Sequence, residues 1–157
     1  MPRTVLYLVT SACGAEAPGI QHAIGSAGSG GKVVVTYVHD PKANEQLKDS
    51  LSAGAFVGLE QVDSVAKAAW ASEEACGQGA MDEARRAAAA AGVDAVLEVL
   101  SGPVLDVVRA SAERHSVDEI VVCRTPGSLL ARFFEPRGIR TLRRQLDVPV
   151  TEVLPSG

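Results

Sequence analysis

The segment EIVVC (Glu119–Cys123) is a short and nearly continuous apolar run. Such a run is typical of a strand that is buried on both faces of a parallel sheet, because no side of that strand faces solvent. The segments VLYLV (5–9) and VVVTYV (33–38) have the same character. Two further β-rich runs are AVLEVL (95–100) and PVTEVL (149–154). The sequence therefore predicts five strands, and we expect the first, second and fourth to lie in the interior of a parallel sheet.

Segments of helical character separate these runs. Residues 15–27 form a short candidate helix that is interrupted by glycine. Residues 103–116 open with Pro103, a residue that is favoured at the first helical position. The side chains of this second segment that we expect to be buried are Leu105, Val108 and Ala112.

The long connection from Pro41 to Gly92 and the segment 137–146 are also expected to contain helices. In the connection, small and apolar residues recur mostly every three or four positions, as they do on one face of a helix. These residues are Val62, Val65, Ala69, Cys76, Ala80, Ala84, Ala88 and Ala91. Gly77 and Gly79 weaken this helix locally, whereas the run 80–91 has very high helix propensity. In the segment 137–146 arginines lie opposite three apolar residues, Ile139, Leu142 and Leu146.

Strands and helices alternate along the whole chain. This order predicts βαβ units with right-handed crossovers, and therefore the α/β class. A chain of 157 residues fits one domain, which we expect to span 1–157.

Charge is unevenly distributed. The formal net charge of −4 argues against a general nucleic-acid-binding protein, which is normally basic. Between Cys123 and Asp147, however, six arginines and two acidic residues give a net charge of +4, which leaves −8 on the rest of the chain. This local patch indicates either a small anionic ligand or acidic partner, or a solvated helix face.

The cysteines and the hydropathy pattern indicate a cytoplasmic protein that does not bind membranes. Cys13, Cys76 and Cys123 form no CxxC pair and have no zinc-like spacing, which fits a reducing compartment. The N-terminus superficially resembles a lipoprotein signal, but its apolar run 5–9 is shorter than the ~7–15 residues of such a signal. No later segment approaches the ~18 apolar residues of a membrane span.

The chain contains no recognisable catalytic or metal-binding motif. The stretch GSAGSGGKV (25–33) differs from a phosphate-binding P-loop, because it is expected to end a helix and lead into a strand. His22, His39 and His115 lie far apart and pair with no cysteine or carboxylate at ligand spacing. No nucleophile–base pair is evident either. We therefore expect neither a metal site nor an enzyme.

Several stretches resemble the universal stress protein family (UspA-like). AERHSVDEIVVC is similar to its last helix and fourth strand, SGPVLDVV to the exit of its third strand, and VTYVHDP to the end of its second strand. The closing pair Pro149-Val150 is similar to the start of its fifth strand. The likeness covers the chain in layout and is specific over about residues 93–154. It implies a Rossmann-like, doubly wound parallel sheet of strand order 3-2-1-4-5 with helices on both faces, and a stress-response homodimer joined through the fifth strands.

One branch of that family binds ATP through an aspartate after strand one and a glycine pattern after strand four. Alignment places Thr10 at the aspartate position and Cys123, Pro126, Pro136 and Arg137 at the glycine-pattern positions. Glycine lets the backbone approach phosphate closely, and proline removes an N–H donor. The segment CRTPGSLLARFFEPRG (123–138) therefore stands where that branch has its phosphate-binding loop, but it lacks the glycines that bind phosphate there. In this respect the chain resembles the branch without the ATP motif.

Two hypotheses follow, with a third class ranked well below them. The leading one is a non-enzymatic regulatory or interaction protein of the stress response that does not bind ATP in the family manner and needs no cofactor. The alternative is a nucleotide-binding module for AMP, ATP or another phosphate ligand, in which Arg124 and Arg137 replace the glycine loop. The candidate ligand residues are Thr10, Val38, Arg124, Gly127, Ser128, Arg137 and Gly138. An ATP-pyrophosphatase-type enzyme would need a Ser-Gly-Gly-x-Asp-Ser-like loop, which TSACGAE (10–16) lacks.

Two geometric expectations remain. The apolar strand 149–154 lies at an edge of the predicted sheet, and we expect it to pair with the same strand of a second copy in antiparallel orientation. Cys13 follows the first predicted strand and Cys123 ends the fourth, and these strands are neighbours in the expected order, so the two sulfur atoms could lie close together. The alternative is that each cysteine is a buried apolar residue, which is the more common role of a free cysteine. A Cys123 side chain turned into the core beneath a helix would exclude a redox role for this pair.

Overall fold

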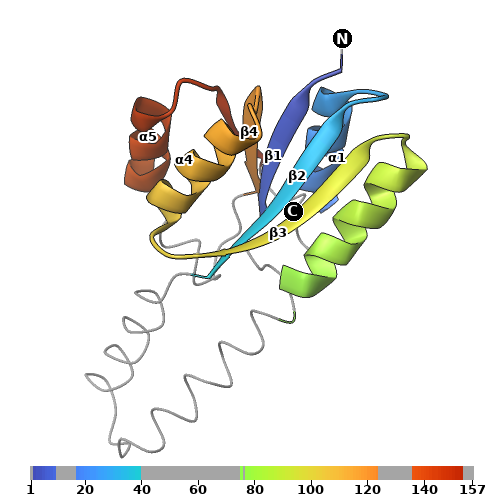
Figure 1. Cartoon of the computed structure of the whole chain (residues 1–157), viewed down its shortest axis with the longest axis horizontal. Coiled ribbons are helices and arrows are strands. Elements are labelled where there is room, and N and C mark those ends of the chain that lie inside the picture. The colour runs from blue at the N-terminus through green and yellow to red at the C-terminus, as the bar shows by residue number, and fades with distance from the viewer. Residues whose placement is uncertain (1, 10–16, 40–74, 76, 124–135, 154–157) are drawn as a thin grey trace, which may run out of the picture.

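The computed structural model describes residues 2–9, 17–39, 75, 77–123 and 136–153. In this part of the chain, five parallel strands form one sheet of order β3-β2-β1-β4-β5. The strands are β1 (Thr4–Val9), β2 (Lys32–His39), β3 (Asp94–Ser101), β4 (Glu119–Cys123) and β5 (Val150–Val153). The predicted α/β class and the strand order that the resemblance implied are confirmed (Figure 1).

The centre of the sheet is apolar because these strands are covered on both faces. Every residue from Val5 to Val9 is fully buried, and β4 is buried along its whole length. At one edge, β3 alternates between half-buried and exposed residues, and Val99 remains 55% exposed. The continuous apolar runs in the sequence therefore mark the interior strands, and alternation marks the edge.

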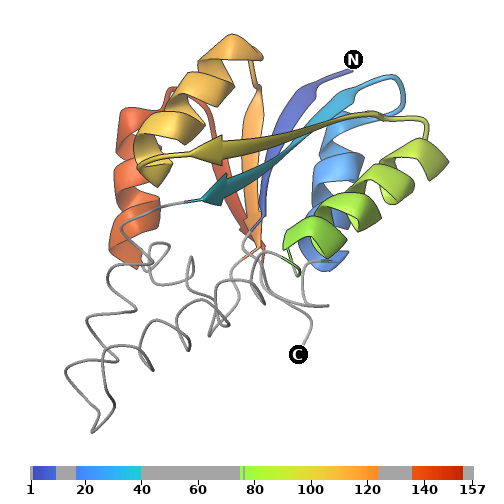
Figure 2. The same cartoon turned by 60° about the horizontal axis from the view of Figure 1, so that its bottom comes forward.

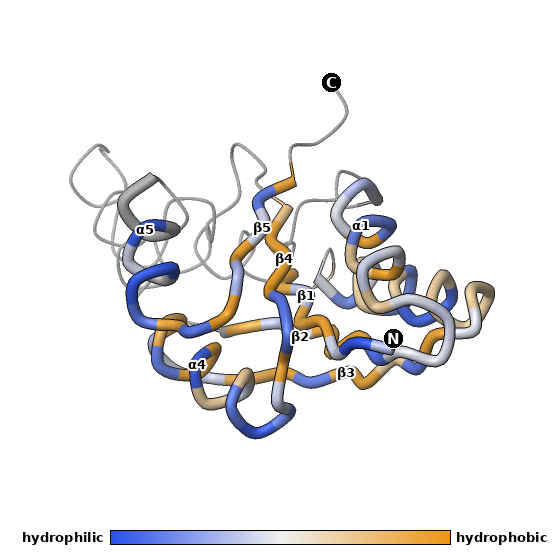
Figure 3. The backbone as a smooth tube through the Cα atoms, turned by 90° about the horizontal axis from the view of Figure 1, so that it is seen from above, coloured by the Kyte–Doolittle hydropathy of each residue, from blue (hydrophilic) through white to orange (hydrophobic). Residues whose placement is uncertain are grey.

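Helices cover the two faces of the sheet as right-handed crossovers require. Helix α1 (Ala17–Ala27) and a helix over 77–90 lie on one side of the strands, and α4 (Val104–Arg114) and α5 (Pro136–Gln145) lie on the other (Figures 2 and 3). None of the helices in the described ranges is long and apolar enough to cross a membrane.

The helical patterns were right in their main features and wrong in a few residues. Ala80, Ala84 and Ala88 are buried as predicted, whereas Ala91 lies in the exposed turn after the helix. In α4, Val108 and Ala112 are buried as predicted, but Val104 and Ser111 join them and Leu105 is only half-buried. Pro103 is the N-cap of α4 and not its first helical residue. Cys76 and the side chains of Ile139 and Leu142 lie outside the described residues.

The glycine-rich stretch after α1 forms a helix-to-strand turn, as its position predicted. The helix ends at Ala27 and β2 begins at Lys32. Gly28 and Gly30 have φ angles of 75° and 81°, in the left-handed region that glycine adopts without strain. The interpretation that this stretch is no P-loop is confirmed, because it neither follows a strand nor opens a helix.

Candidate functional site

The strand order reverses between the neighbouring strands β1 and β4: the chain continues from β1 to β2 on one side and from β4 to β5 on the other. In open α/β sheets a ligand binds at this point, outside the carboxyl ends of the strands. Of the predicted ligand residues, Thr10, Arg124, Gly127 and Ser128 lie outside the described part of the chain. Val38 lies near the end of β2, but its side chain is fully buried in the core, so it presents no surface to a ligand.

Helix α1 lies unusually close to β1 and β4 beneath this crevice. A Cβ atom added to Gly19 would lie 2.8 Å from Cβ of Cys123 and 2.9 Å from Cε2 of Tyr7. Only glycine permits this approach, because the side chains of Cys123 and Tyr7 are both fully buried. The Cys123 side chain thus lies in the core beneath α1, which argues against a redox role for it, whereas Cys13 lies outside the described residues.

Helix α5 begins at Pro136, with Arg137 and Gly138 in its first turn. The N–H groups of a first helical turn have no partner within the helix, and they are the donors that commonly bind phosphate. Proline has no N–H, so this turn offers one donor fewer. The structure therefore brings Arg137 and Gly138 to the start of α5, and the direction of the Arg137 side chain lies outside the description.

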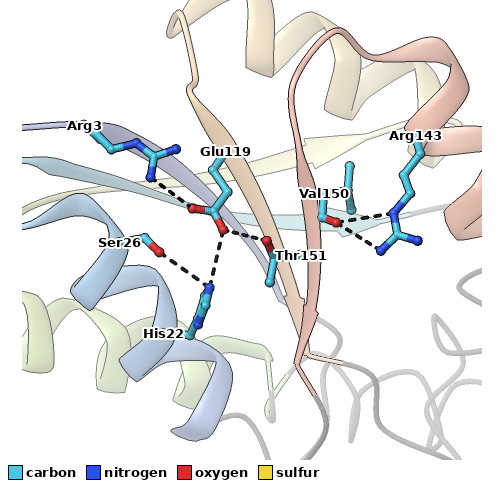
Figure 4. A network of polar contacts seen from close by, with 7 residues as sticks. All are labelled: Arg3, His22, Ser26, Glu119, Arg143, Val150 and Thr151. Atoms are coloured by element: carbon cyan, nitrogen blue, oxygen red, sulfur yellow. Dashed lines mark hydrogen bonds and ion pairs between the residues drawn. The ribbon is translucent and has the colours of Figure 1, made fainter.

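A second polar site, which the sequence did not reveal, surrounds Glu119 at the amino end of β4 (Figure 4). The Thr151 hydroxyl donates a hydrogen bond of 2.6 Å to Oε2 of Glu119, and Nε2 of His22 lies 3.4 Å from the same oxygen. The guanidinium of Arg3 lies 3.6 Å from Oε1. Burial raises the pKa of the Glu119 carboxyl, but hydrogen bonds from Thr151 and Ser26 and the neighbouring His22 outweigh burial and hold the pKa below its usual value. This carboxylate joins β4 to β5, α1 and the N-terminal segment.

A third polar site lies between the other face of the sheet and α4, around Glu98 of β3. Its Oε2 lies 2.7 Å from Nη2 of Arg114 and 3.2 Å from Nε2 of His115, and its Oε1 accepts a hydrogen bond from Ser111. Thr36 donates a further hydrogen bond to Oε1 over 3.4 Å. Burial raises the pKa of Glu98, and the hydrogen bonds from Ser111, His115 and Arg114 lower it to a value below the usual one.

The two ring nitrogens of His115 have distinct roles. Nζ of Lys32 lies 3.5 Å from Nδ1, and a lysine ammonium can only donate, so Nδ1 accepts. Nε2 faces Glu98 and can donate a proton to its carboxylate in the neutral tautomer that this contact favours. Both carboxylates are engaged by their neighbours, and no cluster of three or more histidine, cysteine or acidic side chains suited to a metal ion occurs in the described ranges.

Sequence spacing could not have found these two sites. His22 and Glu119 are 97 positions apart, and His115 and Glu98 are 17 positions apart and lie on different elements. The only sequence signal was a glutamate within an otherwise apolar run, Glu98 in AVLEVL, or at the start of one, Glu119 in EIVVC. Glu119 is the first residue of β4, at the end of the strand opposite to the crevice, so its site belongs to the scaffold and not to a ligand site.

At the open edge of the sheet, Arg143 of α5 contacts the backbone of β5. Its Nε and Nη2 donate hydrogen bonds of 3.3 Å and 3.1 Å to the carbonyl oxygen of Val150. In Figure 4 the guanidinium lies on the side of β5 that faces away from Glu119. Arg143, which was predicted to lie on a solvated or anion-binding helix face, thus donates hydrogen bonds to a backbone carbonyl of the edge strand β5.

Several solved structures with a similar fold are universal stress proteins. UspA from Lactobacillus plantarum superposes with a TM-score of 0.62 at 16% identity, over 96% of this chain and 97% of that one. A universal stress protein in complex with cAMP gives a TM-score of 0.57 at 19% identity, over 98% of both chains. A universal stress protein family protein from Arabidopsis thaliana with AMP bound gives 0.55 at 15% identity, over 99% of this chain and 94% of that one.

No family model and no curated protein matches the sequence. The structural likeness extends over nearly the whole of each chain. At such low identity it shows the fold alone. The chain has the fold of the universal stress proteins, as the sequence resemblance led us to expect.

Proposed function

We propose that this protein is a non-enzymatic regulatory or interaction protein of the universal stress type, which does not bind ATP in the manner of that family's ATP-binding branch. The observation that carries the proposal is the start of α5 at Pro136, where the resemblance places a glycine of the ATP-binding pattern. Cys123 supports it from the other end of the same loop, because a buried side chain stands there in place of a glycine. The cytoplasmic location remains a prediction from the cysteines.

Calorimetry with ATP tests this proposal. With the glycines and the aspartate absent, we expect a dissociation constant no tighter than about 1 mM, which corresponds to ~4 kcal/mol. Native mass spectrometry of freshly purified protein should show no retained nucleotide. A micromolar dissociation constant for ATP would overturn the proposal.

A second candidate function is nucleotide binding through arginines. Two universal stress proteins of the same fold have cAMP or AMP bound, and this observation favours it. In this chain Arg137 lies in the first turn of α5, and Arg124 directly follows β4. Calorimetry with AMP, cAMP and ATP on the wild type and on Arg137→Ala tests it, with Arg144→Ala in the last turn of the same helix as the control. Binding that is lost only in Arg137→Ala would support this second function.

We also propose that the protein is a homodimer joined through strand 149–154. In support, β5 is an edge strand with a polar backbone row, and Val153 on it is half-buried. Val150 is only 7% exposed, so a charge there would disturb the core as well as an interface. Val153→Lys is the better test, and it should yield monomers in sedimentation velocity. A variant that stays dimeric would place the interface elsewhere.

A further inference from the structure

Strand β3 forms the edge of the sheet opposite to β5, and no strand of the described ranges pairs with its outer side. It pairs with β2 along its whole length, Asp94–Ser101, without a bulge. The N–H of Asp94 donates a hydrogen bond of 3.0 Å to the carbonyl of Gly31, so the backbone groups of Asp94 face β2. Because successive residues of a strand alternate in this respect, the backbone groups of the odd-numbered residues of β3 face outward. The edge therefore presents a row of backbone donors and acceptors.

The apolar layer on one face of the sheet continues to this edge and ends there uncovered. The Glu98 side chain reaches α4, so the side chains of Leu97 and Val99 lie on the opposite face, which α1 and the helix that precedes β3 cover. Their pairing neighbours on β2, Val35 and Tyr37, are 0% and 3% exposed. Leu97 and Val99 are 37% and 55% exposed. Two apolar side chains at alternate positions are thus left in contact with solvent.

The edge also lacks the features that usually protect an edge strand. Such strands commonly carry lysine or proline, a bulge, or a charge that discourages pairing. β3 contains neither lysine nor proline, and its register with β2 is continuous. The charge in its middle, Glu98, is bound to Ser111 and Arg114 on the α4 side. The edge is therefore suited to receive an added strand.

A cation lies beside this edge on the α4 side. Nη2 of Arg114 lies 2.7 Å from Oε2 of Glu98, and the Arg114 side chain remains 54% exposed. A guanidinium has five N–H donors, so it can bind a second carboxylate as well. A strand added next to β3 would place a side chain about 5 Å from that of Glu98 on the same face. An acidic side chain fits this position.

We propose that the outer edge of β3 is the docking site for an extended segment of another protein, which adds to the sheet as a further strand. The segment carries apolar residues at alternate positions, which cover Leu97 and Val99, and an acidic residue on the other face, which binds Arg114. Backbone hydrogen bonds provide the affinity and the alternate side chains the specificity. This inference rests on the interaction role proposed above and names the kind of partner. A second copy fits less well, because the carboxylate in the middle of its own β3, Glu98, is already bound by Arg114.

Amide hydrogen exchange followed by NMR tests whether the edge is open. In the free protein we expect the outward amides of Leu97 and Val99 to exchange at least about tenfold faster than those of Val96 and Glu98, which face β2. Equal protection of all four amides would overturn the proposal. Protection of Leu97 and Val99 that grows with protein concentration would mean that a second copy occupies the edge, and would overturn it too.

A library of random linear peptides displayed on phage tests the partner chemistry. Peptides are selected on the wild type and counter-selected on Val99→Lys, which places a charge on the exposed edge. We expect the enriched peptides to alternate apolar with polar residues and to carry an acidic residue, and synthetic copies of them to slow exchange at Leu97 and Val99. A library that yields no such peptide, or peptides that bind Val99→Lys equally well, would overturn the proposal.

Two variants separate the roles of the backbone and of charge, each with circular dichroism to confirm folding. Val99→Pro removes one outward N–H, a change that an edge strand tolerates, and should weaken binding of a selected peptide at least about tenfold. Val99→Thr keeps that N–H and the branched shape, and should stay within about threefold of the wild type. Equal binding by Val99→Pro and Val99→Thr would overturn the added strand, and Val99→Lys replaces Val99→Pro if the proline variant does not fold.

Replacing the acidic residue of the selected peptide with lysine tests Arg114. We expect the acidic peptide to bind the wild type about two- to fivefold more tightly than its lysine version, a modest factor because Arg114 is half exposed, and Arg114→Gln to abolish this preference. A preference that persists in Arg114→Gln would overturn the role of Arg114. Micromolar ATP binding would overturn the regulatory function without changing any of these results, so the two failures are distinguishable.

Discussion

The close approach of α1 to the sheet at Gly19 predicts that Gly19→Ala does not bring the stabilisation that alanine normally brings to a helix. The added methyl carbon would lie 2.8 Å from Cβ of Cys123, 2.9 Å from Cε2 and 3.1 Å from the hydroxyl of Tyr7. Two of these contacts are shorter than side-chain carbons tolerate, and both neighbours are fully buried, so neither can turn toward solvent. The helix must therefore move outward, or the side chains must leave their preferred rotamers.

Gly25 provides a matched control in the same helix, since a Cβ atom there meets nothing within 4 Å. Alanine stabilises a helix relative to glycine by up to ~1 kcal/mol, which both substitutions gain. Overpacking costs about 1–3 kcal/mol, and only Gly19→Ala incurs it. Gly25→Ala should therefore be stabilising by up to ~1 kcal/mol and Gly19→Ala destabilising by about 0–2 kcal/mol.

Thermal unfolding followed by circular dichroism measures both variants beside the wild type. For a domain of this size the difference between them corresponds to roughly 2–12 °C in the melting temperature. A Gly19→Ala protein as stable as Gly25→Ala would refute the reasoning, because it would mean that α1 does not lie this close to β4.

Three further predictions concern stability. The pKa values of Glu98 and Glu119 in the folded protein lie below the ordinary value of 4.5, so these carboxylates stabilise the fold above that pH, and the stabilisation is lost as the pH falls through the folded values. Urea midpoints measured between pH 7 and pH 3 should show this loss of stability. In Glu119→Gln the decrease of the midpoint over the same pH range should be smaller. Glu98→Gln should cost ~1–2 kcal/mol at pH 7, a modest value because Arg114 is half exposed, and an unchanged urea midpoint would contradict it. Gly102→Ala should lower the melting temperature by an amount equivalent to ~1–3 kcal/mol, because φ is 136° at this position and the new Cβ would lie 3.1 Å from Cγ1 of Val107. Calorimetry that finds no change in melting temperature would argue against backbone strain at this turn.

The candidate ligand crevice could be placed from sequence only in outline. The runs 5–9 and 119–123 identified the two strands that flank it, because interior strands of a parallel sheet carry continuous apolar sequences. The ligand role assigned to Val38 did not account for its burial, which depends on what packs over that residue. The start of α5 at Pro136 agrees with the preference of proline for a first helical turn.

The polar sites around Glu98 and Glu119 could not be anticipated, because each joins elements that only the folded sheet brings together. A glutamate inside an apolar run shows that a carboxylate will be partly buried, and a buried carboxylate needs partners. Which residues serve as partners depends on register and on the position of the covering helix. His22 reaches Glu119 only because α1 crosses β4, and Ser111 reaches Glu98 only because α4 lies over β3.

Sequence patterns were enough to predict the α/β class, the interior strands, the glycine turn after α1 and the departures from the glycine pattern, because each depends on hydrophobic periodicity or on the backbone chemistry of single residues. The tertiary structure alone decided that Cys123 is buried against Gly19, that Glu119 is joined to Thr151, and that Arg143 holds the outward carbonyl of Val150. Those facts depend on distances between residues far apart in the chain. Such distances depend on how whole helices and strands pack against one another, and a local sequence pattern does not reveal that packing.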